Sequence, residues 1–390
     1  MRIELHTSFD VDAARARFSS LRSGFVFFDA PGGTQVPDEV GAAVANAMRE
    51  ASSNYGFSYP SSRAATEIME RAREDAARFL GATADEISFG MNMTTLDFAL
   101  SRAAGRDFLD GDEILTTELD HDGGVAPWVE LASDRGLVVR VARATDELTI
   151  DYEDAERLLS ERTRVVAFAL ASNATGSIAD AQRLVALARE AGALSWVDAV
   201  HYAAHEPIDV QALGCDVLVC SPYKFCGPHL GIAYVRAALA ETWRPYKARP
   251  SAAAPTGRKF ETGTLPYELL AGFSATVAYL DTIGGIAAVR EYERELGAHF
   301  LESLPDNVEL YGLATMDGRV PTFLFNVDGV PAAAAAQRLV AEGFGVWNAG
   351  NWYCVALAGR LPEESLRAGI AHYNTRGEVD GLLDALASLS

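Results

Sequence analysis

The sequence predicts an α/β fold in which helices cover both faces of a mainly parallel central sheet. Residues 164–172 (RVVAFALAS) form a continuous apolar run, which is typical of a strand buried on both sides. An apolar helical stripe follows at 181–191 and ends at Gly192. Residues 194–200 and 216–221 have the pattern of two further strands. Strands and a helix at this spacing predict right-handed crossovers between parallel strands.

After residue 265 the pattern changes to two long helices followed by further strands and helices. The helices are expected around 266–284 and 286–304, and strands at 320–327 and 367–373. A chain of 390 residues is long enough for two or three domains. We therefore expect an N-terminal segment that packs with the small domain (1–25), a large domain (26–265) and a smaller α+β C-terminal domain (266–390).

The composition argues against several classes of partner. With 33 basic and 54 acidic side chains the net charge is −21, which would repel nucleic acid and anionic membranes. The N-terminal residues lack the apolar core of a signal peptide, and no run of eighteen apolar residues exists. The four cysteines lack the paired spacing of a zinc site, so we expect no metal and a reducing, cytoplasmic location: Cys215, Cys220, Cys226 and Cys354.

Three polar residues stand at the carboxyl ends of the expected parallel strands. Asn173 follows the first apolar run, Asp198 lies near the end of the second, and Lys224 follows the third by three residues. Ligands of parallel sheets collect at this edge. The sequence therefore predicts a ligand site where these three side chains meet.

The pairing of Asp198 with Lys224 favours pyridoxal 5′-phosphate as the ligand. That cofactor needs a lysine amine to bond its aldehyde and an acid to keep its pyridine nitrogen protonated. A lysine in a tight, partly buried turn loses solvation, which lowers its pKa and frees the amine. Taken alone, Asp198 could cap a turn and Lys224 could be a solvated surface residue, so the inference depends on their pairing.

Other residues meet the remaining needs of the cofactor. Thr94 and Thr95 open an expected helix, whose free N–H groups and a hydroxyl would bind a phosphate. Ser221 and Tyr223 flank the lysine turn and could add hydroxyl donors. His121 is a flat residue that could stack on the ring, although it could equally be an ordinary loop histidine.

Eight segments in order give the chain a resemblance to a known family. They are FFDAPGGTQVP (27–37), SFGMNMTT (88–95), LDHDGGVAPW (119–128), ASNATG (171–176), VDAVH (197–201), CSPYKFCGPHLG (220–231), FETGT (260–264) and RAGIAHYNT (367–375). With them the chain resembles the class V aminotransferases of pyridoxal-phosphate fold type I, and most of all their cysteine desulfurase-like branch. The segments cover nearly the whole chain.

The resemblance implies roles for individual residues. Lys224, Asp198 and His121 would be the catalytic lysine, the pyridinium partner and the stacking residue. Asn173 and His201 would face the ring hydroxyl, with His201 in the place of the glutamine usual in desulfurases. The phosphate would be held by Thr94, Thr95, Ser221, Tyr223 and, in a homodimer with shared sites, by Thr264 of the other subunit. Substrate contacts are expected from Gly32, Asn173, Trp352, Tyr353 and Arg367, whose two-donor fork would grip a carboxylate.

One departure from the family bears on the reaction. Desulfurases carry a persulfide-forming cysteine on a loop before the carboxylate-binding arginine, but here Tyr353 falls at that position when Gly350 is aligned with the loop glycine. Bulky Trp347, Trp352 and Tyr353 suggest an aromatic pocket instead. The leading hypothesis is therefore β-elimination from cysteine or an S-substituted cysteine, a C–S lyase reaction.

Alternatives remain open at this stage. The first is a cysteine or selenocysteine desulfurase that uses Cys354, although Cys354 also reads as a small buried apolar residue. The second is decarboxylation coupled to oxidative deamination, or epimerisation, of an S-cysteinyl or other amino-acid substrate in a biosynthetic pathway. Transamination is less favoured because no feature selects a second amino acceptor. The last is a non-catalytic scaffold that has kept the fold.

Overall fold

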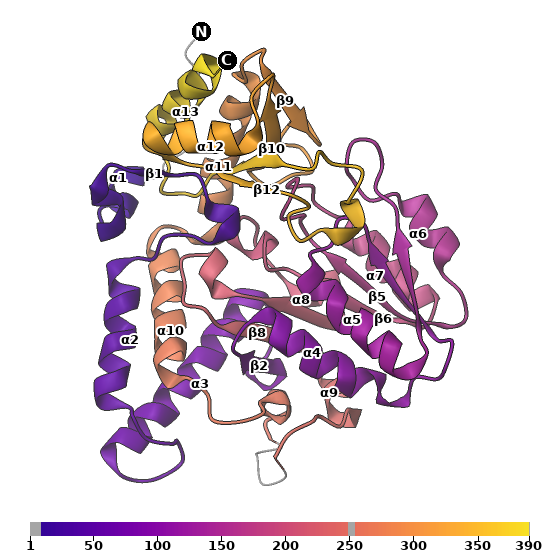
Figure 1. The fold of residues 1–390 in the computed structure, drawn as a ribbon. Helices are drawn as coiled ribbons and strands as arrows, with labels where there is room; N and C mark the ends of the chain where they lie inside the picture. The colour runs from indigo at the N-terminus through magenta and orange to yellow at the C-terminus, as the bar shows by residue number, and fades with distance from the viewer. Residues whose placement is uncertain (1–8, 249–253, 390) are drawn as a thin grey trace.

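The computed structural model describes residues 9–248 and 254–389, and its largest element is a seven-stranded sheet (Figure 1). The strands lie in the order β2-β8-β7-β6-β5-β3-β4. Their bounds are β2 (Ile87–Gly90), β8 (Gly231–Val235), β7 (Val217–Cys220), β6 (Leu194–Asp198), β5 (Thr163–Ala169), β3 (Glu113–Thr117) and β4 (Val138–Ala142).

Most neighbouring strands of this sheet run parallel. The pairs β7–β6, β6–β5, β5–β3 and β3–β4 are parallel, whereas β8 is antiparallel to both β2 and β7. The expected α/β fold with a mainly parallel sheet is confirmed. The three strands expected from apolar runs correspond to β5, β6 and β7, each within a few residues.

Helices cover both faces of the sheet because both faces of its strands are apolar. Along β5, Val165 and Ala167 belong to one core cluster, and Val166 and Phe168 belong to the other. The first cluster is completed from α4 (Met93–Ala104), α5 (Asp122–Arg135) and α9 (Ala237–Thr242). The second is completed from α3 (Pro60–Leu80), α6 (Tyr152–Leu158), α7 (Ala181–Glu190), α8 (Val210–Leu213) and α10 (Tyr267–Thr282).

A second, smaller sheet lies above the first, at the end where the C-terminal residues gather (Figure 1). It is antiparallel in the order β12-β13-β10-β9 and has its own apolar core. Its elements are β9 (Val308–Tyr311), β10 (Thr322–Val327), β12 (Trp347–Ala349) and β13 (Ser365–Gly369), with α11 (Gly285–Glu302), α12 (Ala332–Ala341) and α13 (Arg376–Ser388).

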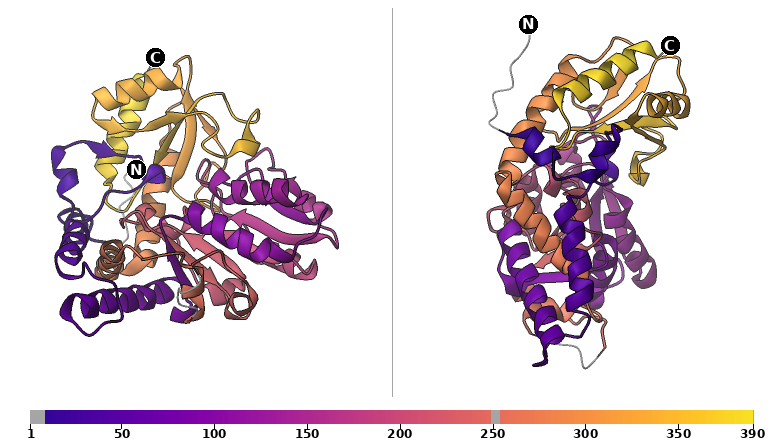
Figure 2. Two further views of the ribbon diagram at one scale, coloured as in Figure 1. Left: turned by 60° about the horizontal axis from the view of Figure 1, so that its bottom comes forward. Right: turned by 90° about the vertical axis from the view of Figure 1, so that its left-hand side faces the viewer.

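Residues 9–27 lie against this smaller sheet and its helices (Figure 2). β1 (Val26–Phe27) pairs in parallel with β11 (Phe344–Gly345). Upstream, the ring of Phe9 stacks on Tyr292 at 4.7 Å, and Arg15 in α1 (Val11–Arg15) pairs with Glu378 at 2.8 Å. The expected domain bounds remain predictions. Residues 1–8 lie outside the described residues. In addition, α10 was expected in the small domain but packs on α2 (Asp38–Glu50) and α3 of the large domain.

Neither a single membrane-spanning helix nor a metal-binding cluster occurs in residues 9–248 and 254–389. No single helix there is long and apolar enough to cross a membrane, while α10 and α11 pass only as a pair that is bent by 64°. No group of three or more His, Cys, Asp or Glu side chains in the same residues is arranged to hold a metal ion.

Candidate active site

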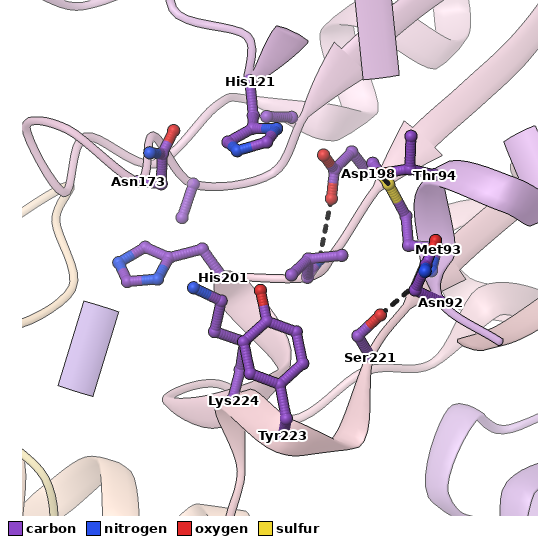
Figure 3. A pocket seen from close by; sticks show the side chains of 13 residues that line it. Asn92, Met93, Thr94, His121, Asn173, Asp198, His201, Ser221, Tyr223 and Lys224 are labelled. Atoms are coloured by element: carbon purple, nitrogen blue, oxygen red, sulfur yellow. Dashed lines mark hydrogen bonds between the residues drawn. The ribbon is translucent and has the colours of Figure 1, made fainter. Parts of the chain in front are cut away.

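A pocket opens at the carboxyl ends of β5, β6 and β7, beside the N-terminus of α4 (Figure 3). This is the edge at which the sequence predicts a ligand site. The polar side chains that line the pocket are Asn92, Thr94, His121, Asn173, Asp198, His201, Ser221, Tyr223 and Lys224.

Asp198 is the last residue of β6 and stands at the pocket wall. Its Oδ1 accepts the main-chain N–H of Val200 at 2.8 Å, which fixes the carboxylate next to the turn that follows the strand. Burial raises the pKa of Asp198 to about 6, against the opposing effects of the Val200 N–H and the positive charge of Lys224. At neutral pH the carboxylate is therefore mainly ionised and suited to a cationic N–H partner.

Lys224 ends a short 3₁₀ turn, Pro222–Lys224, directly after β7. Its side chain is buried and donates to the main-chain carbonyl of Pro31, while the ammonium lies 4.8 Å from the centre of the Tyr223 ring. Burial lowers the pKa of Lys224 to about 7; the charge of Arg367 acts in the same direction and Asp198 opposes it. A substantial fraction of the amine is thus neutral near pH 7, as a nucleophile or base must be.

His121 is the N-cap of α5, and its ring lines the pocket. Nδ1 accepts the N–H of Gly123 at 2.9 Å, so the ring proton resides on Nε2. Burial lowers the pKa of His121 to about 4, with further contributions from Lys224 and Arg367, so the ring is neutral. The Tyr353 ring stacks on it at 5.3 Å with an interplanar angle of 20°.

The N-terminus of α4 forms the end of the pocket opposite Lys224. Asn92 caps the helix, Thr94 lies in its first turn, and the Ser221 hydroxyl accepts the N–H of Met93 at 3.1 Å. Unpaired N–H groups and hydroxyls at a helix start favour an anion. Thr95, also expected in the phosphate site, is exposed outside the pocket lining, and its hydroxyl bonds to the main chain of Asn92.

A second pocket adjoins the first on the side of the smaller sheet. It shares His121, Asn173, Tyr223 and Lys224 with the first pocket. The residues that it adds include all the remaining expected substrate contacts together with Trp347: Gly32, Trp347, Trp352, Tyr353 and Arg367. The two pockets together place Lys224 between a possible anion site and an aromatic chamber.

Arg367 is buried on β13 at the wall of this chamber. Its Nη1 donates to the main-chain carbonyl of Asn173 at 2.7 Å, and its Nε has no partner in the described residues. The guanidinium lies 4.2 Å from the Trp352 ring centre and 5.9 Å from that of Trp347. Burial lowers the pKa of Arg367 to about 10, which leaves it charged at neutral pH and short of hydrogen-bond acceptors.

The loop that precedes β13 is fastened to the large domain. Asn173 donates from Nδ2 to the Trp352 carbonyl at 2.8 Å, and Asp122 donates from its main-chain N–H to the Tyr353 carbonyl at 2.7 Å. Trp352 and Tyr353 have φ values of 56° and 62°, a conformation that bulky residues rarely adopt. The contacts to Asn173 and Asp122 hold the loop in this strained shape.

In the same loop, Cys354 is turned inward and Tyr353 outward. The Cys354 thiol is fully buried and donates to Asn173 Oδ1 at 3.2 Å, whereas Tyr353 is 69% exposed. Burial raises the pKa of Cys354 to about 12, and the nearby Asp120 adds to this effect. The thiol is therefore protonated and screened from solvent.

Thr264 lies apart from the pocket of its own chain. It is exposed and lines two surface hollows together with Met48, Met91 and Asn54. The resemblance assigns Thr264 to the phosphate of another subunit, a role that a position on an exposed surface permits.

Four features of the lining residues match the requirements of pyridoxal phosphate. An ionised carboxylate, a buried lysine with a lowered pKa, a neutral flat imidazole and a helix N-terminus face one cavity. In addition, His201 lines the pocket with a buried Nδ1 that has no partner in the described residues. A polar substituent on a bound ring would form a hydrogen bond with this unpartnered nitrogen.

Comparison with known proteins identifies the family. The family model Aminotransferase class-V matches residues 26–382. The chain therefore belongs to the class V aminotransferase family, and it is a pyridoxal-phosphate enzyme of the cysteine desulfurase-like branch. The fold type and cofactor expected from the sequence are confirmed.

Individual relatives point to the same branch. A probable cysteine desulfurase 2 of Mycobacterium leprae is 37% identical over 82% of this chain and 80% of its own length. The apo cysteine desulfurase of Thermococcus onnurineus superimposes with a TM-score of 0.90 at 26% identity, covering 99% of this chain and 98% of the other. The cystine C–S lyase C-DES gives 0.85 at 20% identity over 96% and 100%, a likeness of fold alone.

Two residues of the site, Asn92 and Thr322, were not predicted from the sequence. Asn92 could have been found, since an asparagine three residues before Thr95 is an N-cap signal. Thr322 contacts His201 from a distant strand, and its sequence neighbours carry no signal of that contact.

Proposed function

We propose that this enzyme catalyses β-elimination from an S-substituted cysteine, releasing a thiol, pyruvate and ammonia. The observation that carries the proposal is the state of Cys354. A persulfide carrier needs a thiolate that reaches the substrate, and a buried thiol with a pKa raised to about 12 supplies neither. Elimination needs no protein thiol.

The chain's own residues can perform the proton transfers that elimination requires. The bound cofactor supplies an electron sink for the charge that develops at the substrate α-carbon. Lys224 has a pKa lowered to about 7, so its neutral amine can take the α-proton at neutral pH and return it as an acid. Asp198 would keep the ring nitrogen protonated by remaining ionised, and the neutral imidazole of His121 would stack on the ring and fix its orientation.

The aromatic chamber supports a substrate larger than free cysteine. The charged Arg367 would pair with the α-carboxylate, which directs the side chain of the substrate toward Trp347, Trp352 and Tyr353. Aromatic walls favour an apolar or aromatic substituent on sulfur. Loss of the C–S bond breaks the substrate at Cβ, and water then converts the remaining three-carbon fragment to pyruvate and ammonia.

The relatives support sulfur chemistry but are named for two different reactions. Cysteine desulfurases transfer sulfur, and the more distant C-DES is named a cystine C–S lyase. At the loop cysteine this chain differs from the desulfurase pattern. Its sequence is nevertheless more similar to the desulfurases than to C-DES. A desulfurase that uses Cys354 is therefore the principal alternative.

Substitution of Cys354 separates these two reactions. We expect Cys354→Ala to form pyruvate from S-benzylcysteine at a rate within about twofold of the unsubstituted enzyme, because the thiol takes no part. The matched control is Cys215→Ala, a second buried cysteine that lies outside the pocket. Loss of turnover in the first variant alone, together with alanine as the product from cysteine, would instead establish the desulfurase route.

Product analysis tests the remaining alternatives. Mass spectrometry of the same reaction should detect pyruvate and the free thiol in equal amounts. Carbon dioxide with an aldehyde would indicate decarboxylation, and a racemised substrate would indicate epimerisation.

A further inference from the structure

The two ring nitrogens of His201 differ in their hydrogen bonding. Nε2 lies 2.8 Å from the hydroxyl of Thr322, whereas Nδ1 is buried and has no partner in the described residues. Figure 3 shows the imidazole beside the end of the Lys224 side chain. The ring nitrogen left for a bound group is therefore Nδ1.

Thr322 is held firmly in place although it comes from the smaller sheet. It is fully buried at the start of β10, where it pairs with Gly369 of β13. Its carbonyl accepts a 2.5 Å hydrogen bond from Arg319, whose guanidinium also donates to the carbonyl of Thr175 at 2.9 Å. Arg319 thus ties Thr322 to the loop that carries Asn173, so the hydroxyl has little freedom to leave His201.

The direction of the Thr322–His201 hydrogen bond follows from counting donors. Burial keeps His201 neutral by lowering its pKa well below the usual value, so the ring has one N–H. If Nε2 carried it, the threonine O–H would be a buried donor without an acceptor, because His201 is the partner found for this hydroxyl across residues 9–248 and 254–389. If the hydroxyl donates to Nε2, the N–H moves to Nδ1. Buried donors are rarely left unpaired, so the second arrangement is favoured once an acceptor occupies the pocket.

We propose that Thr322 is a positioning residue for the cofactor: its hydroxyl donates to Nε2 of His201 and thereby makes Nδ1–H a hydrogen-bond donor to the anionic ring oxygen. The neighbouring amide of Asn173 can supply only one hydrogen bond to the cofactor, so the ring oxygen needs a second donor from His201. Its Nδ2 already donates to Trp352 and its Oδ1 accepts from Cys354, so it has one N–H left for the cofactor. The inference concerns cofactor binding and does not depend on which substrate bond is broken.

The consequence is a change in acidity at the lysine–cofactor linkage. A donor to the ring oxygen stabilises the negative charge that grows when the linkage loses its proton, and this lowers the pH at which the proton leaves. The titratable groups that face His201 are His205, Lys224, Arg367 and His121. They are the same in a Thr322 variant, so a change in the titration can be assigned to the lost hydroxyl.

The test is a pH titration of the visible absorption band of the holoenzyme. Thr322→Val keeps the shape and strand preference of the residue but removes the hydroxyl, and we expect the midpoint to rise by about one pH unit. Thr322→Ser is the matched control and should keep the midpoint of the unsubstituted enzyme. In a His201→Gln background, Thr322→Val should produce no further shift, because the effect passes through the imidazole.

An unchanged midpoint in Thr322→Val, or an equal shift in both backgrounds, would overturn the proposal. If the valine variant fails to fold or to bind the cofactor, the unsubstituted holoenzyme still provides a test. Nitrogen NMR of labelled histidine should show the proton of His201 on Nδ1, with the signal assigned by its loss in His201→Gln. A proton on Nε2 contradicts the proposed direction of the hydrogen bond.

Discussion

At the scale of single residues, burial sets the ionisation of the groups that face the pocket. Asp198 is buried next to a positive charge and remains mainly ionised, with a pKa of about 6. Lys224 is buried next to both Arg367 and Asp198, and burial prevails, so its pKa falls to about 7. Burial therefore frees the amine of Lys224 for bond formation, whereas the Val200 N–H and the charge of Lys224 oppose burial at Asp198 and keep its carboxylate mainly ionised.

The lowered pKa of Lys224 predicts how the apoprotein rebinds its cofactor. Only the neutral amine attacks the aldehyde, so the rate of band formation should rise to half its plateau near pH 7 and level off above pH 8. An exposed lysine, with a pKa of about 10.4, would keep gaining rate to pH 10. Stopped-flow absorbance measures the rate, Nα-acetyl-lysine corrects for the ionisation of the cofactor, and Lys224→Ala should form no band. A rate that still rises steeply between pH 8 and 10 would contradict the lowered pKa.

Some site residues could be predicted from the sequence and others could not. Asp198 ends one buried strand and Lys224 follows another, so their place at one sheet edge follows from the apolar runs alone. Arg367 was found only through the family resemblance, because an arginine on a strand has no local mark of burial. Thr322 was not found, since its contact with His201 depends on how the two sheets are placed.

At the scale of elements, the strands were predictable and the active-site loop was not. β5, β6 and β7 are buried on both faces, which leaves an unbroken apolar pattern in the sequence. The loop of Trp352 and Tyr353 adopts positive φ angles against the local preference of both residues. Such a conformation arises from tertiary contacts, here with Asn173 and Asp122, and a local pattern cannot reveal it.

The turn Ala30–Gly32 meets β12 in the aromatic chamber, and this contact predicts a specificity change. A Cβ at Gly32 would stand 3.0 Å from the Trp347 ring, so in Gly32→Ala that ring must move by a few tenths of an ångström. This movement changes the shape of the aromatic chamber at Trp347, and we expect the KM for S-benzylcysteine to rise about tenfold. The KM for S-methylcysteine should change by less than about twofold, because a small substituent does not reach Trp347.

The matched control for this prediction is Gly41→Ala on α2, where an added Cβ meets nothing within 4 Å. It should leave both KM values unchanged. Equal KM changes for the two substrates in Gly32→Ala would show that Trp347 does not contact the substituent.

At the scale of the whole molecule, an exposed apolar surface surrounds Thr264. Met48, Met91 and Phe57 line the same two hollows as Thr264, and all three are exposed in the single chain. Apolar side chains gathered in this way mark an interface. In the homodimer that the family resemblance implies, this surface would bury Thr264 against the phosphate of the other subunit.

We predict that light scattering will give twice the mass of the chain. The double variant Met48→Glu, Phe57→Glu should be monomeric and should bind the cofactor at least about tenfold more weakly, because each site loses Thr264 of the other subunit. Leu109→Glu is the control, since Leu109 is equally exposed but lies outside this surface. Thr264→Ala should remain dimeric with weakened cofactor binding, and a monomeric unsubstituted protein would refute the shared site.

The pairing of β1 with β11 has a consequence for the synthesis of this protein. Val26 and Phe27 leave the ribosome long before Phe344 and Gly345 are synthesised. β1 therefore remains unpaired during most of the synthesis of the chain. Closing so large a loop is slow compared with forming the local helices. The segment of Pro31 and Gly32, which lines the aromatic chamber, is thus placed among the last steps of folding. A nascent chain that stalls before residue 344 contains Lys224 but lacks the chamber residues Trp347, Trp352 and Arg367.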